Sequence, residues 1–315
     1  MNVGPTAGFS TAGGRAFERY GWATLGVTVL VIVWGAVVRA TGSGAGCGDH
    51  WPLCNGEIVP LDPTVQTTIE FVHRVTSGAV MVMALVFWMW ARRLFPNGHQ
   101  ARRWARITLI FMIIEAAIGA GIVLLRLVED NASALRAGYV GGHLVNTLLL
   151  VGAMLTTLWW ARPDRPSTPL GSMLAGVARP LTFCLIALLA VASTGAIVAL
   201  GDTLFPHATL AEGMAADLDP TSHFLIRLRI WHPVFAALTG LVLFRIAARG
   251  EVPPRNSRFI VATVVAQIAL GVVNLLLLAP LWLQMAHLVM SNVLWMAVVW
   301  SWLDARASSG LVRAA

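Results

Sequence analysis

Eight long apolar runs constrain this sequence of 315 residues more than any other feature. A helix needs about 20 apolar residues to cross the hydrocarbon core of a bilayer. Inside lipid every backbone polar group must be paired within the structure, so such runs must be helical. We therefore predict an all-α integral membrane protein with eight transmembrane helices, at residues 21–41, 68–91, 104–125, 139–160, 179–200, 224–246, 257–278 and 281–303.

The composition is typical of a chain surrounded largely by lipid. Only 12% of the residues are charged and the mean hydropathy is +0.73, whereas soluble domains carry about 25% charged residues. These values exclude a soluble enzyme or binding domain. The first apolar run begins at Trp22 and is too long for the h-region of a signal peptide, so we expect no cleavable leader.

The 22 basic residues are all arginines, and their distribution predicts the orientation. Cytoplasmic loops are enriched in Arg and Lys. We therefore predict a multi-pass protein of the cell membrane with both termini in the cytoplasm. The net charge of +7 then reflects topology, and we expect the lipid bilayer but no nucleic acid as a partner. With this orientation the outer side holds six arginines: Arg39, Arg74, Arg126, Arg136, Arg227 and Arg229.

The two halves of the chain resemble each other. Matching segments occur in spans 1 and 5, 3 and 7, and 4 and 8, namely 35–38 with 195–198, 115–119 with 267–271, and 142–145 with 286–289. Four spans per half is an even number, so both halves face the same way, as in parallel repeats. We predict two tandem pseudo-symmetric four-helix bundles, residues 1–160 and 161–315.

Four histidines lie at equivalent places in this repeat, within about two turns of the outer ends of the even-numbered spans. Ionisable residues inside membrane helices are costly and usually functional. Zinc or copper sites usually recruit Cys or carboxylates as well, whereas two histidines facing each other in an apolar bundle suit bis-histidine heme. The four predicted iron ligands are His73, His143, His232 and His287, and the remaining four histidines are expected at the solvated surface.

Four of the outer arginines lie at span edges beside these histidines: Arg39, Arg74, Arg227 and Arg229. Heme propionates are anions, and a guanidinium is the natural bidentate partner of a carboxylate. We interpret these arginines as candidate propionate partners. Contact with lipid phosphates is the alternative.

Two acidic residues distinguish the halves. Glu70 precedes His73 by three residues and shares its helix face, whereas the equivalent position in the second half holds Arg229. A carboxylate present in one half only is a candidate for chemistry, although a first-turn Glu is also favoured by the helix dipole. Glu115 lies near mid-membrane and matches the neutral Gln267. We expect Glu115 to be protonated and hydrogen-bonded to another helix, with a proton-relay role as the alternative.

The first outer loop contains Cys47 and Cys54, separated by six residues. On the oxidising side of the membrane a disulfide between them can form and persist. Such a bond is either structural or redox-active, and the spacing does not decide between them. Cys184 stands alone in an apolar run, which favours core packing.

The loop sequence TGSGAGCGDHWPLC at 41–54, followed by IEFVHRVTSG at 69–78, resembles the heme A synthases. The resemblance extends over nearly the whole chain. It implies oxidation of the C8 methyl group of heme O to a formyl group, giving heme A for terminal cytochrome oxidase. It also implies that His73 and His143 bind the substrate heme O, that His232 and His287 bind a heme b cofactor, and that Glu70 is catalytic.

If the substrate is heme O, the enzyme that makes it, heme O synthase (a protoheme farnesyltransferase), is a candidate partner. The resemblance leaves the electron acceptor and a homo-oligomeric state open. Two other functions compete. A diheme membrane cytochrome in quinol-linked electron transfer would share the four histidines, and a heme transporter or chaperone would bind heme without turnover. Neither accounts for the ExxHR motif (Glu70 to Arg74) in one half only.

Overall fold

The computed structural model describes residues 12–165, 176, 178–250 and 252–312. Within these residues eight helices are long and apolar enough to cross a membrane, which confirms the predicted number. The protein is therefore an all-α, multi-pass membrane protein. The long helices are α1 (Ala12–Ala40), α2 (Val65–Leu94), α3 (Gln100–Leu124), α4 (Ala134–Trp160), α5 (Ala178–Leu204), α8 (Trp231–Ala248), α9 (Pro254–Leu276) and α10 (Leu281–Val312).

Most helices extend beyond the predicted spans, and in α2 and α4 a polar side chain caps the helix outside the apolar run. Thr64 caps α2 by accepting a hydrogen bond from Thr67 N, and Ser133 caps α4 in the same way. The sixth span is divided between a short helix, α7 (Phe224–Arg227), and α8.

The loop before the sixth span contains a helix that the apolar pattern does not predict, α6 (Leu210–Leu218). A capping box begins it. Thr209 Oγ1 accepts from Glu212 N, and Glu212 Oε2 accepts from Ala208 N. The Thr-x-x-Glu spacing is legible in the sequence. A one-turn 3-10 helix, η1 (Ser43–Ala45), lies in the first outer loop.

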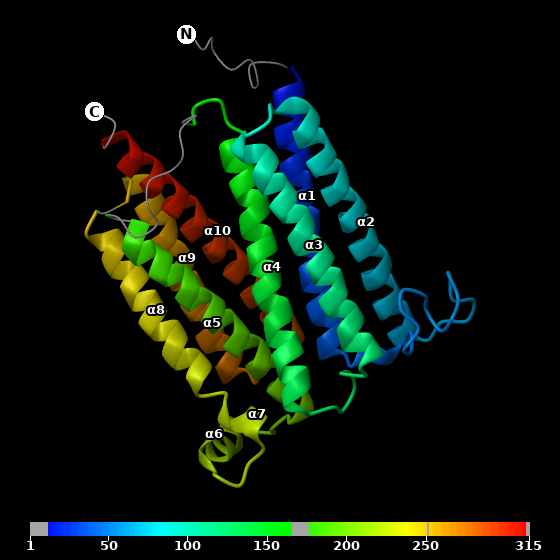
Figure 1. Cartoon of the computed structure of the whole chain (residues 1–315). Helices are drawn as coiled ribbons and strands as arrows, with labels where there is room; N and C mark the ends of the chain where they lie inside the picture. The colour runs from blue at the N-terminus through cyan, green and yellow to red at the C-terminus, as the bar shows by residue number, and fades with distance from the viewer. Residues whose placement is uncertain (1–11, 166–175, 177, 251, 313–315) are drawn as a thin grey trace, which may run out of the picture.

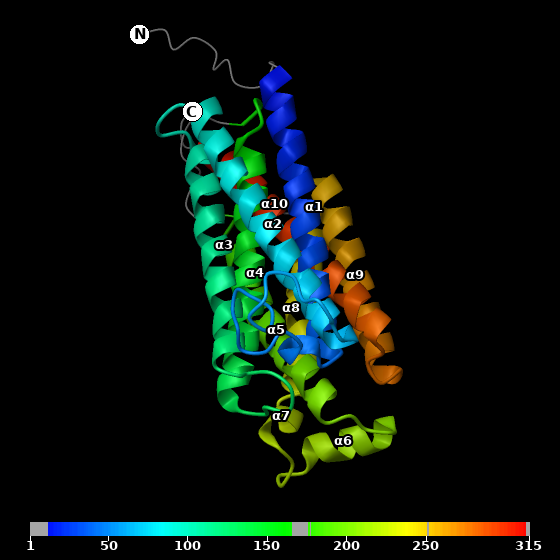
Figure 2. The same cartoon turned by 90° about the vertical axis from the view of Figure 1, so that its right-hand side faces the viewer.

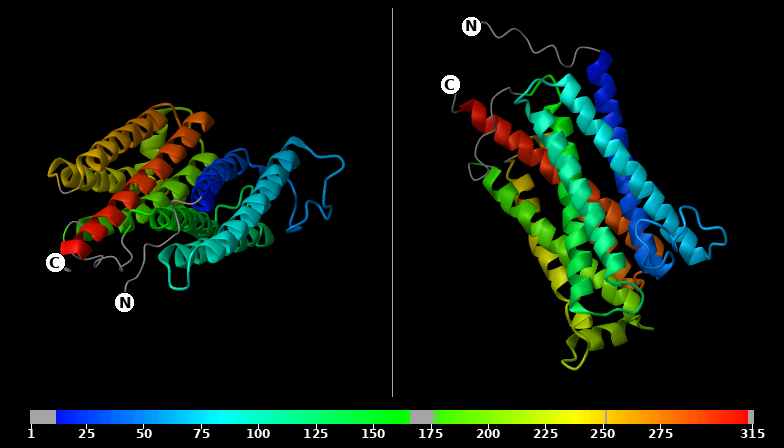
Figure 3. Two further views of the ribbon diagram at one scale, coloured as in Figure 1. Left: turned by 90° about the horizontal axis from the view of Figure 1, so that it is seen from above. Right: turned by 45° about the vertical axis from the view of Figure 1, so that its right-hand side comes forward.

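The long helices form two rings of four. In the first half, neighbouring helices contact one another in the order α1, α2, α3, α4 and back to α1. In the second half, the corresponding order is α5, α8, α9, α10 and back to α5. Helices α1, α4, α5 and α10 also contact one another across the centre of the molecule. Figures 1 and 2 show the helices side by side, and Figure 3 shows the two groups on opposite sides from above. The pseudo-symmetry itself stays a prediction.

We call the end of the molecule that carries residues 41–64, α6 and α7 the outer end, following the predicted orientation (Figure 1). The main buried core lies toward the opposite, inner end. It includes Phe17, Phe87, Trp159 and Trp295, and Cys184 is part of it, as predicted. On the helices that carry the four histidines, this core begins roughly one to three turns inward from each histidine. The histidines thus lie just beyond the outer limit of the apolar core.

Polar contacts join the two halves at both ends. At the outer end, Arg39 of α1 donates to Ala199 O and Thr203 Oγ1, each at 2.6 Å, and to Gln284 Oε1 at 2.9 Å. At the inner end, Asp304 of α10 accepts from Trp159 Nε1 of the first half at 2.9 Å, and from Arg165 and Asn256 of the second half. The two halves are therefore joined by polar contacts at both ends of the molecule. That residues 1–160 and 161–315 act as separate functional units stays a prediction.

Candidate functional site

The four predicted ligands lie in the outer part of four different helices: His73 in α2, His143 in α4, His232 in α8 and His287 in α10. All four are half-buried. Within the described residues, Nδ1 of three of them is buried without a hydrogen-bond partner. Buried polar atoms normally have partners, so three such nitrogens on predicted heme ligands are unusual.

In the C-terminal half the two imidazoles face each other. The ring centroids of His232 and His287 are 6.4 Å apart and the rings are inclined by 77°. An imidazole nitrogen binds a metal at about 2 Å, so two rings on one iron atom have centroids about 6 Å apart. The spacing therefore fits a shared metal ion.

The hydrogen bonds of His232 leave its other nitrogen available. Its Nδ1 lies 3.1 Å from Val191 O and 3.3 Å from Thr194 Oγ1. Because a carbonyl oxygen can only accept, Nδ1 carries the hydrogen and Nε2 keeps a free lone pair. An Nδ1–H bonded to a carbonyl is the usual support of a metal-binding histidine. His287 Nε2 lies 3.0 Å from Gln267 Nε2, and iron at that nitrogen would take the place of this contact.

Glycines allow three imidazoles to lie against a neighbouring helix. A Cβ added to Gly35 would be 2.9 Å from His73 Cε1, and a Cβ added to Gly195 would be 2.9 Å from His232 Cε1. A Cβ at Gly271 would be 3.1 Å from His287. Gly35 and Gly195 are equivalent in the sequence repeat. Both halves therefore hold one imidazole in the same manner.

The surroundings of His143 are polar. Glu115 Oε1 lies 3.4 Å from His143 Nδ1. Asn146 Nδ2 donates to Glu115 Oε2 at 2.6 Å, and the Thr147 hydroxyl donates to Oε1. The hydrogen bond from Glu115 to another helix is confirmed. The expected protonated form stays a prediction, because Thr147 has a single hydroxyl hydrogen and His143 O also accepts it at 2.9 Å.

Glu70 is buried, with 3% of its surface exposed, one turn before His73. Its Oε2 accepts from Cys47 N at 2.7 Å, and its Oε1 accepts from Arg74 Nη2 at 2.5 Å. A carboxylate is costly to bury unless it is paired and hydrogen-bonded. Glu70 meets both conditions through its own helix and the first outer loop.

The first outer loop is closed by a disulfide between Cys47 and Cys54, which confirms the expected pairing. The loop packs directly on the start of α2. A Cβ added to Gly46 would lie 2.5 Å from Gln66 O and 2.6 Å from Thr67 N, so only glycine fits there. The loop therefore covers the helix turn that leads to Glu70.

The four candidate propionate arginines all lie at the outer end, and their partners differ. Arg74 donates to Glu70 and to the carbonyl oxygens of His50 and Leu53. Arg229 Nε lies 3.3 Å from Asp202 Oδ1, and its Nη2 donates to Phe205 O. Arg39 donates to neutral groups, as described above. Arg227 is exposed and donates to Pro220 O at 3.0 Å.

Sequence reasoning missed several polar partners in the outer loops. Asp202 and Asp217 both approach Arg229, and burial raises the pKa of Asp217 while Arg229 opposes that rise. In the first half, Asp49 of the cysteine loop pairs with Arg126 Nη2 at 2.6 Å. Only the excess of acidic residues in these loops hinted at such pairs, because the partners are far apart in the sequence.

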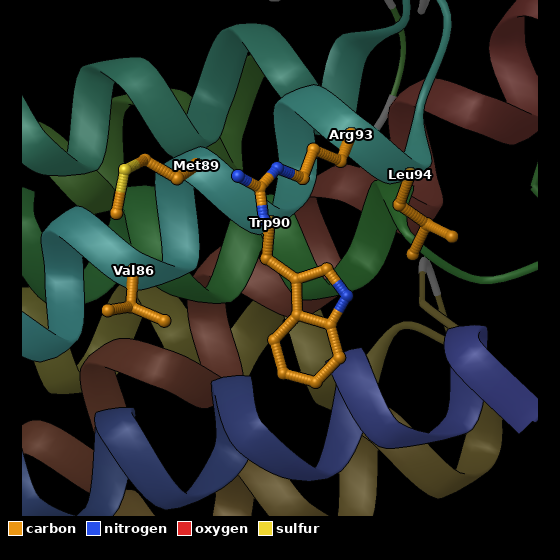
Figure 4. Close-up of a pocket in the computed structure, with 5 residues that line it drawn as sticks. All are labelled: Val86, Met89, Trp90, Arg93 and Leu94. Atoms are coloured by element: carbon orange, nitrogen blue, oxygen red, sulfur yellow. The ribbon is translucent and has the colours of Figure 1, made fainter.

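Two hollows in the surface lie outside the histidine pairs. One, of about 370 Å³, is lined by five residues of α2, and Figure 4 shows the Trp90 indole pointing toward α1. Its nearest lining residue, Val86, is 13 residues from His73, or about 20 Å along the helix. The second, of about 560 Å³, lies at the outer end beside Arg227 and Trp231. Trp231 immediately precedes His232.

Known proteins resemble this chain over most of its length. Residues 18–299 match the COX15-CtaA family of cytochrome oxidase assembly proteins. A protein from Thermus thermophilus named protoheme IX farnesyltransferase is 42% identical over 302 residues, which cover 94% of this chain and 48% of that protein.

Proteins named heme A synthase are also similar. One from Halalkalibacterium halodurans is 33% identical over 155 residues, 49% of this chain and 50% of that protein. One from Shouchella clausii is 35% identical over 136 residues, 43% of this chain and 45% of that protein. The chain thus spans about half the length of the curated relatives it matches. With the family match covering most of the sequence, this chain belongs to the COX15-CtaA family of cytochrome oxidase assembly proteins.

Proposed function

We propose that this protein is a heme A synthase, an oxidoreductase that converts the C8 methyl group of heme O to a formyl group by successive hydroxylations. The observation that carries the proposal is that each half has two histidines at its outer end, and only one half adds a buried carboxylate, Glu70. The family match and the relatives named heme A synthase support the same activity.

We assign the substrate heme O to His73 and His143 and a heme b cofactor to His232 and His287. The C-terminal pair fits a heme iron by its ring spacing and by the free Nε2 of His232. Bound heme b would supply one-electron redox chemistry beside the substrate half. The polypeptide would contribute the imidazoles that hold the iron and the glycines that make room for them.

Glu70 is the proposed catalytic residue. It sits one turn from His73 and is held by Cys47 N and Arg74, so its carboxylate has a defined position. A carboxylate there is suited to stabilise positive charge that develops at the methyl carbon, or to accept its proton. Arg74 would pair with the ionised form of Glu70.

Arginines at the outer end are the proposed partners of the heme propionates. Arg74 and Arg229 already lie against the carboxylates of Glu70 and Asp202. Among the described residues, the acceptors of Arg39 and Arg227 are neutral. A propionate competes more easily with a neutral acceptor than with a carboxylate, so we favour Arg39 and Arg227.

The farnesyltransferase name of the Thermus thermophilus relative suggests a partner rather than a different activity. The match covers about half of that protein, so its other half is free to hold a second function. We propose that heme O synthase, which farnesylates protoheme, acts directly before this chain. The arginine distribution supports placing both sites toward the outer face of the cell membrane, with both termini in the cytoplasm.

Expression of the full chain in cells that make heme O, followed by chromatography of extracted hemes, tests the activity. We expect heme A to appear with the intact chain and heme O to accumulate with the Glu70→Gln variant. A diheme electron-transfer cytochrome would leave the heme O of the cells unconverted and yield no heme A.

A further inference from the structure

We propose that Glu115 is a positioning residue that acts through His143, making this imidazole a stronger iron ligand than any in the C-terminal half. The inference rests on the proposed heme assignment and adds to it. Glu115 has no role in the proposed chemistry, yet its carboxylate lies against His143, a predicted heme ligand.

The contact involves the nitrogen that would not bind iron. Glu115 Oε1 lies 3.4 Å from His143 Nδ1, so a small rotation of the ring completes a hydrogen bond and leaves Nε2 for the metal. A carboxylate that accepts the Nδ1–H of a ligating histidine fixes its tautomer and raises its basicity. Glu115 is in the right place for this role.

Its orientation is set by two other side chains of α4. Asn146 Nδ2 donates to Oε2 at 2.6 Å and also to Phe111 O at 3.0 Å, which ties α4 to α3. The Thr147 hydroxyl lies against Oε1, the same oxygen that faces His143, and is 2.9 Å from His143 O. Only 18% of the Glu115 side chain is exposed. The carboxylate is therefore held toward His143 in a partly buried setting, where charge acts strongly.

The C-terminal half lacks this arrangement at the matching position. Gln267 replaces Glu115 in the repeat, and the supported histidine is His232, whose Nδ1 faces the neutral carbonyl of Val191. A carboxylate acceptor donates more electron density to the ring than a carbonyl does. We therefore expect His143 to favour ferric iron, which lowers the reduction potential of a heme bound in the N-terminal half.

The test is a redox titration, followed by absorbance, of the purified full-length protein loaded with protoheme. A His143→Ala variant first identifies the absorbance of the N-terminal heme by its loss. We then expect Glu115→Gln to raise the reduction potential of that heme. The equilibrium constant for its reduction should increase about tenfold, which is about 59 mV for one electron. The potential of the C-terminal heme should not move.

Thr147→Val provides a second, opposite readout with Glu115 intact. Without the hydroxyl, more of the carboxylate charge is available to His143, so the potential of the same heme should fall. Unchanged potentials in both variants, or equal shifts of both hemes, would overturn the proposal. If Glu115→Gln loses heme altogether, the direction of the Thr147→Val shift decides. Absence of heme from the N-terminal half of the wild-type protein would instead refute the underlying heme assignment.

Discussion

In the N-terminal half, Glu70 lies on the same helix as His73, and Glu115 lies against His143. The matching positions of the C-terminal half hold Arg229 and Gln267. The helix rings and the glycine contacts of His73 and His232 are alike. The two halves thus share a scaffold for imidazoles but differ in charge around it. An acidic setting suits the half proposed to convert the substrate, and a setting without those acids suits the half proposed to hold the cofactor.

The largest effect should come from removing the imidazoles. His232→Ala or His287→Ala should abolish most of the heme b absorbance, because an axial ligand is lost. His73→Ala and His143→Ala should retain that absorbance and lose heme A formation. An unchanged heme b spectrum in both C-terminal variants would refute the division of labour between the halves.

Glu70→Gln should lower heme A formation by about 10²–10⁴-fold, the usual contribution of a positioned acid–base group, while heme b remains bound. Glu57→Gln is a matched control, since Glu57 is an exposed carboxylate of the first outer loop, close in sequence to Glu70. Chromatography of extracted hemes measures both. Normal heme A yield from the Glu70 variant would remove this residue from the mechanism.

Removal of the loop disulfide tests whether this bond is structural or redox-active. A Cys47→Ser, Cys54→Ser double variant should lose about 2 kcal/mol of stability, since the bond closes a short loop. Thermal unfolding in detergent and heme A yield should be measured together. Activity that falls in proportion to stability indicates a structural bond. Lost activity at unchanged stability would instead assign the bond a redox role.

Gly35→Ala and Gly195→Ala test whether the halves hold their imidazoles alike. Each new methyl group would meet an imidazole carbon at 2.9 Å. Overpacking typically costs about 1–3 kcal/mol, and we expect the lower end because the ring can turn. Each variant should reduce heme occupancy in its own half. Loss from the opposite half would contradict the equivalence.

The smallest effect should come from Arg126→Gln. The Arg126 hydrogen bond lowers the pKa of Asp49 below its ordinary value of 3.8. The pair therefore adds stability above that pH, and the contribution is lost as the pH falls through the lower pKa of the folded state. Both groups are exposed, so thermal unfolding at pH 7 should change little. At pH 3 the difference between variant and wild type should shrink further.

The number of spans and the four outer histidines could be predicted because both depend on local pattern: apolar run length and position within a run. The contacts of Glu115 and Glu70 could not. Glu115 meets Asn146 across 31 residues, and Glu70 meets Cys47 N across 23. Such pairs depend on how each helix is rotated about its own axis. Lipid is as apolar as the helix interfaces, so the periodicity of apolar residues does not determine that rotation.

Arg39 at one end and Asp304 at the other link the N-terminal helices to the C-terminal ones. A force that tilts either bundle must strain contacts at both ends of the molecule, so these contacts resist movement of one bundle against the other. If both imidazole pairs bind heme as proposed, an electron that passes between them crosses a gap that these contacts help to hold.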